Sequence, residues 1–404
     1  MSYAPSYDYQ RGFRGICFAI PLLLLSAATT RAWTGKEAKD MWTGYNNDFY
    51  TTGDGGNIFV ASPGGSITPL WQFANEIEMA EDGYWFMANH YSSESRSSYV
   101  TEINNLCTGF QGHNGKLWTS DPYNDDIIWS VMAFARANII TGNSQWLSDA
   151  ESNFNAVWGR AQPGGVTDGS NGLEQVTQSG TGPRMYANVN YAFVIAGYML
   201  NGITNDSSYK TKADAVYKWA QAHLYAYNAA PAQNGSGNVC SRIYNYNDTQ
   251  WGGTIQVRDV MYNYGIAINA ATREGDTTTA QTVANWVMYN VDFDNSGGQP
   301  YNGTYNGYNV LPNYASGSNN ATNDAGYNGI CLRGFTFALQ RNVLTNPDAL
   351  PWAQANIQSA WNNRGTDNVE WCDWQNKPSG TKYSWGDSCA MTGMFDITPP
   401  GGYN

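Results

Sequence analysis

Two neighbouring carboxylates, Asp125 and Asp126, are the residues in this sequence best suited to chemistry. They stand near the start of the segment YNDDIIWSVMAFARANIITGNSQWL, residues 123–147. Gly142 is of the type that ends a helix, so the helix is expected to close there. The aspartates should then lie in its first turn, near free backbone N–H groups and the positive end of the helix dipole. Residues recurring at three- and four-residue steps predict one buried face of this helix: Ile127, Ile128, Val131, Ala135, Asn138 and Ile139.

Such a pair suits glycoside hydrolysis, which needs one carboxyl group as proton donor and another as nucleophile or base. In retaining enzymes the two groups lie about 5 to 5.5 Å apart. Side chains diverging from Cα atoms about 3.8 Å apart can reach that separation. Because two close anions cannot both ionise freely, one pKa should rise and leave a protonated acid beside an ionised nucleophile. An acidic first turn also arises simply to complement a helix dipole, so the pair alone leaves both interpretations open.

The elements around this pair predict an all-α fold. Helical periodicity is expected over residues 36–50, 70–91, 95–110, 125–141, 144–160, 188–201, 207–227, 256–273, 277–291, 325–342 and 348–362, and more weakly over 384–395. About a dozen helices, joined alternately by short turns and long loops, predict antiparallel pairs curled into a double-layered barrel. No linker or composition shift divides residues 33–404, so a single catalytic domain is expected.

The long connections indicate where the functional site should lie. Residues 162–187, 228–255, 292–324 and 363–383 are rich in Gly, Asn, Tyr and Ser. Loops of such length within a compact domain are usually functional or disordered, and their many aromatic residues argue against disorder. We therefore expect them to form the walls of a cleft at one end of the barrel.

Composition favours a sugar-binding protein over a nucleic-acid-binding one. Aromatic residues make up 14% of the 404 residues, with 16 Trp and 28 Tyr, whereas charged residues make up only 13%. Aromatic faces stack on the apolar faces of sugars, although many of these rings must belong to the core. A net charge of −12 argues against a polyanionic partner. No Cys/His spacing resembles a zinc site, and neither a metal nor an organic cofactor is expected.

The N-terminus predicts secretion. Arg11 and Arg14 precede an apolar run over residues 16–28, which is short for a membrane span and suited to a signal peptide. Residues 1–32 are interpreted as that signal, with cleavage near Ala32, no stable membrane insertion and an extracellular or cell-wall location. An uncleaved anchor is the alternative. Acceptor triplets for N-glycosylation agree with secretion: they begin at Asn205, Asn234, Asn247, Asn302 and Asn320.

Five cysteines remain after the predicted signal: Cys107, Cys240, Cys331, Cys372 and Cys389. Outside the cell most of them should pair. Cys372 and Cys389 lie in one loop-rich segment and are the first candidate for a disulfide bond. Sequence alone does not establish the connectivity.

The motifs, taken in order, resemble those of glycoside hydrolase family 76, the endo-α-1,6-mannanases and related fungal wall-assembly proteins. The strongest match is Y-x-D-D-x-x-W, formed by Tyr123, Asp125, Asp126 and Trp129. Weaker matches are GGV at 164–166, YNYG at 262–265, Asp324 followed by YNGICLR at 327–333, and WCDW at 371–374. The likeness runs from about residue 71 to 374. Departures from the family pattern at Tyr264 and Asn328 leave the exact glycan and linkage open.

This resemblance implies an (α/α)6 barrel and a retaining mechanism, with Asp125 as nucleophile and Asp126 as general acid/base. It also suggests substrate-binding residues, with core packing or loop bracing as the alternative for Trp129, Asn190 and Asn263. Arg333 is expected to pair with Asp324 and brace the barrel. The full set of candidate substrate-binding residues is Trp129, Tyr123, Asn190, Asn263 and Asp324.

The function expected from these features is a secreted, monomeric endo-hydrolase of α-1,6-mannan. A cell-wall transglycosylase acting on mannan or a GPI glycan would use the same covalent intermediate. The C-terminal DITPPGGYN lacks an apolar tail, which favours a freely diffusing enzyme. A non-catalytic carbohydrate-binding protein would not need both aspartates. A terpenoid synthase would need a second acidic metal-binding motif, which the sequence does not offer.

Overall fold

The computed structural model describes residues 32–52, 57–91, 96–163, 168–176, 184–228, 238–249, 252–289, 303–312, 325–387 and 389–403. Residues Ala32–Asn404 form one compact unit. Its described part is mostly helical, as predicted. The helices are α1 (Gly35–Phe49), α2 (Leu70–His90), α3 (Ser97–Asn114), α4 (Asn124–Thr141), α5 (Ser144–Arg160), α6 (Ala187–Thr204), α7 (Ser207–His223), α8 (Met261–Glu274), α9 (Thr277–Tyr289), α10 (Tyr327–Gln340), α11 (Ala349–Asn362) and α12 (Met391–Asp396).

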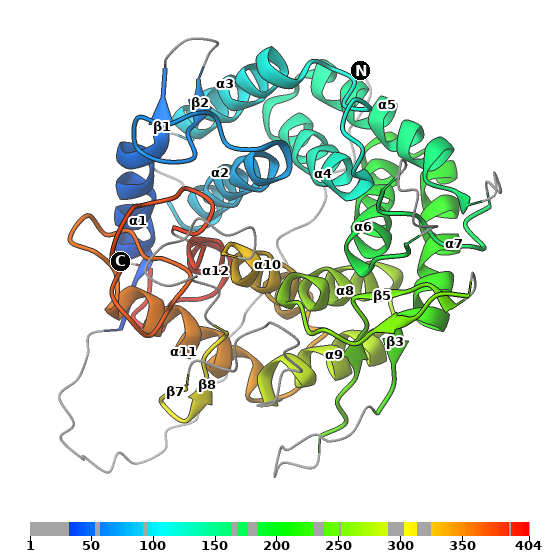
Figure 1. Cartoon of the computed structure of the whole chain (residues 1–404). Coiled ribbons are helices and arrows are strands. Elements are labelled where there is room, and N and C mark those ends of the chain that lie inside the picture. Colours follow the sequence, from blue (N-terminus) through cyan, green and yellow to red (C-terminus); the bar gives the residue numbers. More distant parts are fainter. Residues whose placement is uncertain are drawn as a thin grey trace. The chain divides into compact units, whose positions relative to one another are not determined.

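The helices form two concentric layers (Figure 1). The even-numbered helices make the inner ring, in which α2, α4, α6, α8, α10 and α12 each contact the next and α12 returns to α2. The odd-numbered helices lie outside them. The predicted double-layered helical barrel is therefore the arrangement found in this unit.

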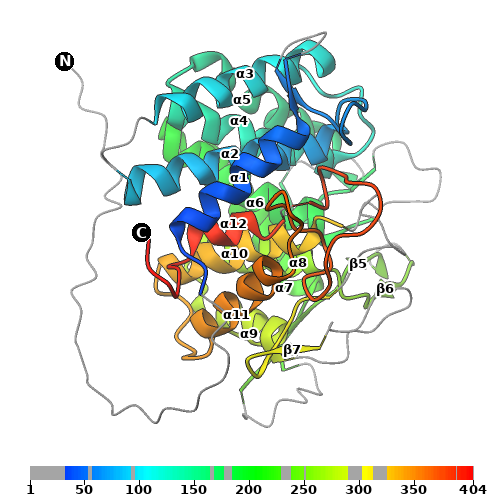
Figure 2. The same cartoon turned by 90° about the vertical axis from the view of Figure 1, so that its left-hand side faces the viewer.

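Long connections all enter the inner helices at their N-terminal ends. The inner helices α2, α4, α6, α8 and α10 are each followed by a short turn to the next outer helix, whereas a longer segment leads from each outer helix to the next inner one. Because each turn reverses the chain, the starts of the inner helices and the long segments share one end of the barrel. Figure 2 shows β5, β6 and β7, which belong to these segments, on one side of the helices.

Strands are short and confined to these connections. Four antiparallel pairs of two-residue strands occur in the described residues. They are β1 (Tyr50–Thr51) with β2 (Ile58–Phe59), β3 (Tyr225–Ala226) with β4 (Arg242–Ile243), β5 (Tyr246–Asn247) with β6 (Ile255–Gln256), and β7 (Thr304–Tyr305) with β8 (Tyr308–Asn309).

The α4–α5 hairpin follows its sequence signals closely. Gly142 ends α4 in the left-handed conformation with φ of 70°. The Asn143 side chain then accepts a hydrogen bond from the Gln145 backbone and caps α5. The predicted burial of Ile139 was wrong, because this side chain is 52% exposed near the C-terminal end of the helix.

Two predicted helix starts were also wrong. The helix expected from residue 256 begins at Met261, because residues 255–256 pair as strand β6 with β5. The last helix begins at Met391 rather than near 384 and is short. Where α8 packs on α10, a Cβ atom on Gly334 would collide with the carbonyl oxygen of Gly265. Glycine at these two positions therefore lets the helices approach closely, which accounts for the glycine of the YNYG motif.

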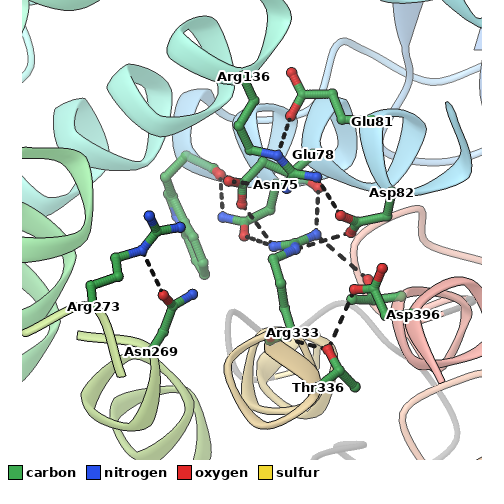
Figure 3. Close-up of polar contacts among 12 residues, drawn as sticks. Asn75, Glu78, Glu81, Asp82, Arg136, Asn269, Arg273, Arg333, Thr336 and Asp396 are labelled. Carbon is green, nitrogen blue, oxygen red and sulfur yellow. Dashed lines mark hydrogen bonds and ion pairs between the residues drawn. The ribbon is translucent and has the colours of Figure 1, made fainter. Parts of the chain in front are cut away.

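A buried ion cluster joins α2, α4 and α10 inside the barrel (Figure 3). Arg333 lies 2.8 Å from Glu78 and 3.1 Å from Asp82. Arg136 lies 2.5 Å from Asp82 and 3.2 Å from Glu81. Arg333 does brace the barrel, but its partners are these α2 carboxylates. The partner expected from sequence, Asp324, lies outside the described residues.

The predicted Cys372–Cys389 disulfide is not formed. No disulfide bond joins any of the five described cysteines, all of which are buried. Burial, and the nearby Glu370 carboxyl, raise the pKa of both Cys372 and Cys389. Because thiolates are the species that form disulfides, this surrounding disfavours the bond.

Among the described helices, none is both long enough and apolar enough to cross a membrane.

Candidate active site

Asp125 and Asp126 lie in the first turn of α4, at the barrel end where the long connections gather. The preceding residue, Asn124, anchors this turn to the loop before α6. Its side chain donates to the carbonyl of Glu174 at 2.7 Å, and its backbone donates to the carbonyl of Gln175 at 2.7 Å. Arg160 of α5 donates to the Asn124 side chain at 2.6 Å. The loop is thereby held against the aspartate pair.

Asp125 is a nearly buried carboxylate held by two amides. Its Oδ2 accepts a hydrogen bond from Asn188 Nδ2 at 2.5 Å and another from Gln175 Nε2 at 3.1 Å. Asp125 is only 6% exposed, and its Oδ1 has no hydrogen-bond partner within the described part of the chain. Burial raises the pKa of Asp125, and the Gln175 hydrogen bond lowers it in part.

Asp126 has a different environment from its neighbour. It is partly exposed, and no side chain in the described ranges hydrogen-bonds to its carboxyl. Burial raises the pKa of Asp126, and the negative charges of Asp125 and Asp121 raise it further. Amide donors stabilise the ionised form of Asp125, and repulsion by Asp125 disfavours ionisation of Asp126. When the pair holds a single proton, that proton therefore belongs on Asp126. The arrangement offers an ionised acid beside a protonated one.

Aromatic side chains from the first turns of other inner helices surround this pair. Tyr262, at the start of α8, accepts a hydrogen bond from Asn188 Nδ2 at 3.1 Å. Its ring packs edge-on against Tyr327 of α10, with centroids 4.3 Å apart, and against Trp129 of α4 at 6.2 Å. The first turns of α6 and α8 thus meet that of α4 at Asp125, and the first turn of α10 packs against Tyr262. Trp129 is 3% exposed, so it supports Tyr262 from within the core.

The other predicted substrate-binding residues divide into three cases. Tyr123 is 45% exposed beside the pair and stays a candidate. Asn190 and Asn263 are both buried and brace loops, which is the alternative that the sequence left open for them. The Asn190 amide bonds to both backbone groups of Leu173, and the Asn263 amide donates to Asn245 at 2.9 Å. Asp324 lies outside the described residues.

Asn188 and Gln175, the two residues that hold Asp125, were not predicted from the sequence. Asn188 stands two positions before the predicted Asn190, in the same first turn of α6. Gln175 belongs to a long loop with no regular periodicity. Its nearest sequence signal is its place between the two helices that carry Asp125 and Asn188.

The model of glycosyl hydrolase family 76 matches residues 31–397 of this chain. The chain belongs to this family. No curated protein matches it in sequence. Several structures of family 76 proteins share its fold, and the match covers most of both chains in each comparison below.

One such structure is an inactive variant of the α-1,6-mannanase GH76A of Salegentibacter sp. HEL1_6, with two aspartates replaced by alanine, bound to α-1,6-mannotetraose. It is 20% identical to this chain, covering 90% of this chain and 98% of its own, with a TM-score of 0.68. Dfg5 from Chaetomium thermophilum, in complex with glucosamine, is 14% identical, covering 90% and 88%, with a TM-score of 0.61. These likenesses establish a family 76 fold.

Proposed function

We propose that this family 76 glycoside hydrolase cleaves α-1,6-linked mannan within the chain, by a retaining mechanism, outside the cell. The observation that carries the proposal is the unequal environment of Asp125 and Asp126. Two amides donate to the first carboxylate, whereas burial and the negative charge of Asp125 raise the pKa of the second. A neutral acid and an ionised nucleophile side by side are what retaining glycoside hydrolysis requires.

In the first step, an oxygen of Asp125 bonds to the anomeric carbon and the glycosidic C–O bond breaks. Asp126 gives its proton to the departing oxygen, so the leaving sugar departs as an alcohol. In the second step, water gives a proton to Asp126 and attacks the anomeric carbon, which frees Asp125. Since Asp125 is only 6% exposed, substrate must displace the Gln175 amide that lies against it from the loop.

The choice of substrate is supported by the family and by its solved members. The mannanase of Salegentibacter sp. HEL1_6 has been crystallised with α-1,6-mannotriose as well as with the tetraose. Aromatic rings near the acids, such as Tyr262 and Tyr327, agree with a carbohydrate ligand. Secretion rests on the signal-like N-terminus. It is tested by recovering the chain from culture medium and determining where its mature N-terminus begins.

The test is a product profile on linear α-1,6-mannan. The wild type is expected to release a ladder of oligosaccharides, and Asp126→Asn should slow turnover about 10²- to 10⁴-fold. Asp125→Asn should slow it at least as much, since no covalent intermediate can form. Undiminished turnover in either variant contradicts the assignment. Added mannooligosaccharide acceptor distinguishes hydrolysis from transfer, because a transglycosylase would lengthen the acceptor instead of releasing reducing ends.

A further inference from the structure

An open pocket whose lining residues are of polar types lies in the outer layer, between the end of α1 and the exposed face of α3. Its volume is about 460 Å³, which falls within the range of small-molecule sites. None of its lining residues belongs to the candidate active site at the start of α4. The residues that matter for its chemistry are Asn46, Tyr50, Ser98, Thr101, Glu102 and Asn105.

The pocket forms because α3 is amphipathic. Its apolar residues, including Ile103, Leu106 and Phe110, are fully buried against the barrel. The polar residues of the opposite face recur at helical spacing, with Thr101 and Asn105 four residues apart, and point away from that core. The end of α1 then closes one side of the groove they line.

Its lining is uncharged apart from one carboxyl group. Among its described residues none is basic, and amides and hydroxyls predominate. Burial raises the pKa of Glu102 to about 7, so this carboxyl is partly protonated near neutral pH and can both donate and accept. The pocket is therefore unsuited to phosphate, nucleic acid or a strongly cationic ligand, and suited to a neutral polyol.

The pocket offers both polar groups and an aromatic ring to a sugar. Ser98, Thr101 and Asn105 supply hydroxyl and amide groups that can exchange hydrogen bonds with sugar hydroxyls. Tyr50 supplies a ring whose position is fixed by edge-on packing against Phe59, with centroids 5.8 Å apart. A fixed aromatic ring beside amide and hydroxyl groups is a common way to hold a sugar.

We propose that the pocket between α1 and α3 is a second carbohydrate site, which binds α-1,6-mannan remote from the aspartate pair. This site holds one segment of the mannan on the enzyme while another segment of the same mannan molecule reaches Asp125 and Asp126. Linking two weak contacts through one polymer raises the effective affinity without strengthening either contact. The inference rests on the proposed function, because its ligand is the proposed substrate.

The test uses the catalytically silent protein Asp125→Asn/Asp126→Asn, titrated calorimetrically with α-1,6-mannotetraose. Two sites per chain are expected, the weaker with a Kd on the order of 1 mM. Thr101→Trp fills the pocket from an exposed helix position and should weaken that site at least about tenfold. Thr108→Trp is the matched control, since Thr108 is also exposed on α3 but does not line the pocket. Tyr50→Ser, which removes the ring without adding bulk, should weaken the same site.

In the active enzyme, Thr101→Trp should leave turnover of short oligosaccharides unchanged and reduce retention on insoluble mannan. One site per chain, or a second site unaffected by both Thr101→Trp and Tyr50→Ser, overturns the inference. If the wild type turns over mannan but the silent variant has a single binding site, the second site is refuted and the proposed function stands. Absence of both turnover and binding refutes the proposed function as well.

Discussion

Asn188 Nδ2 lies 2.5 Å from Oδ2 of Asp125 and 3.1 Å from the hydroxyl oxygen of Tyr262. One amide group thus ties the first turns of three inner helices, α4, α6 and α8, together at the candidate nucleophile. The side chains come from positions 63 and 74 residues apart in sequence. The orientation of Asp125 therefore depends on the closure of the helical ring and not on α4 alone.

Asn188→Ala should reduce kcat/KM about 10- to 150-fold, because a hydrogen bond to a charged group contributes about 1.5 to 3 kcal/mol. The loss should fall mainly on kcat, since the amide positions the nucleophile. Asn201→Ala, on the same helix and far from its first turn, serves as the control. Steady-state kinetics on α-1,6-mannooligosaccharides measure the effect. An equal loss in both variants would mean that Asn188 matters only for folding.

Gln175→Ala should move the acidic limb of the pH–rate profile upward by roughly half to one pH unit. The Gln175 hydrogen bond lowers the pKa of Asp125, so its removal raises that pKa and a higher pH is needed to ionise the nucleophile. The alkaline limb, which reports loss of the Asp126 proton, should stay nearly unchanged. A pH profile of kcat/KM checks this. A shift of the acidic limb to lower pH would contradict the assignment of Asp125 as the ionised group.

Glu76→Gln should flatten the dependence of stability on pH. Burial raises the pKa of Glu76 from 4.5 to about 8, and the hydroxyls of Ser384, Thr68 and Tyr45 offset this only in part. The folded state then binds a proton that the unfolded state has released, so wild-type stability falls as pH rises from about 4.5 to 8. The loss is on the order of 4 kcal/mol across that window. Urea unfolding at several pH values measures it, and identical slopes for wild type and variant would refute the prediction.

Arg333→Met should destabilise the fold by about 3 to 5 kcal/mol, since it removes one of the two cations that neutralise the buried carboxylates of α2. Glu78 and Asp82 would lose their 2.8 Å and 3.1 Å contacts, and Arg136 alone would face both (Figure 3). Lys210→Met breaks an exposed pair with Asp214 and should cost about 1 kcal/mol or less. Denaturant unfolding compares the two. Equal costs would show that the cluster contributes no more than a surface pair.

Local signals predicted the helices well where the chain itself carries them. Periodicity and capping residues placed α5 at Ser144–Arg160, and Gly142 ended α4 as expected. The start of α8 could not be found in this way, because residues 255–256 pair with a strand across a turn. Periodicity does not distinguish a strand pair of two residues from the first turn of a helix.

The acids were predictable and their partners were not. Adjacent aspartates at a helix start are visible in sequence, but Gln175 and Asn188 reach them only through tertiary contacts. The sequence pointed to Asn190 and not to Asn188, and the difference between them is geometric. Two residues along a helix are separated by about 200° around its axis, so one amide faces Asp125 and the other faces the loop. The sequence does not give the orientation of α6 about its own axis, and without that orientation Asn188 and Asn190 cannot be distinguished.

The central claim, that Asp125 is the nucleophile and Asp126 holds the proton, is tested most directly by trapping the glycosyl-enzyme. A mannosyl donor with fluorine at C2 and an activated leaving group slows breakdown of the covalent intermediate. Peptide mapping by mass spectrometry then locates the added sugar. One mannosyl adduct is expected, on Asp125, and none in Asp125→Asn. An adduct on Asp126 instead would contradict it.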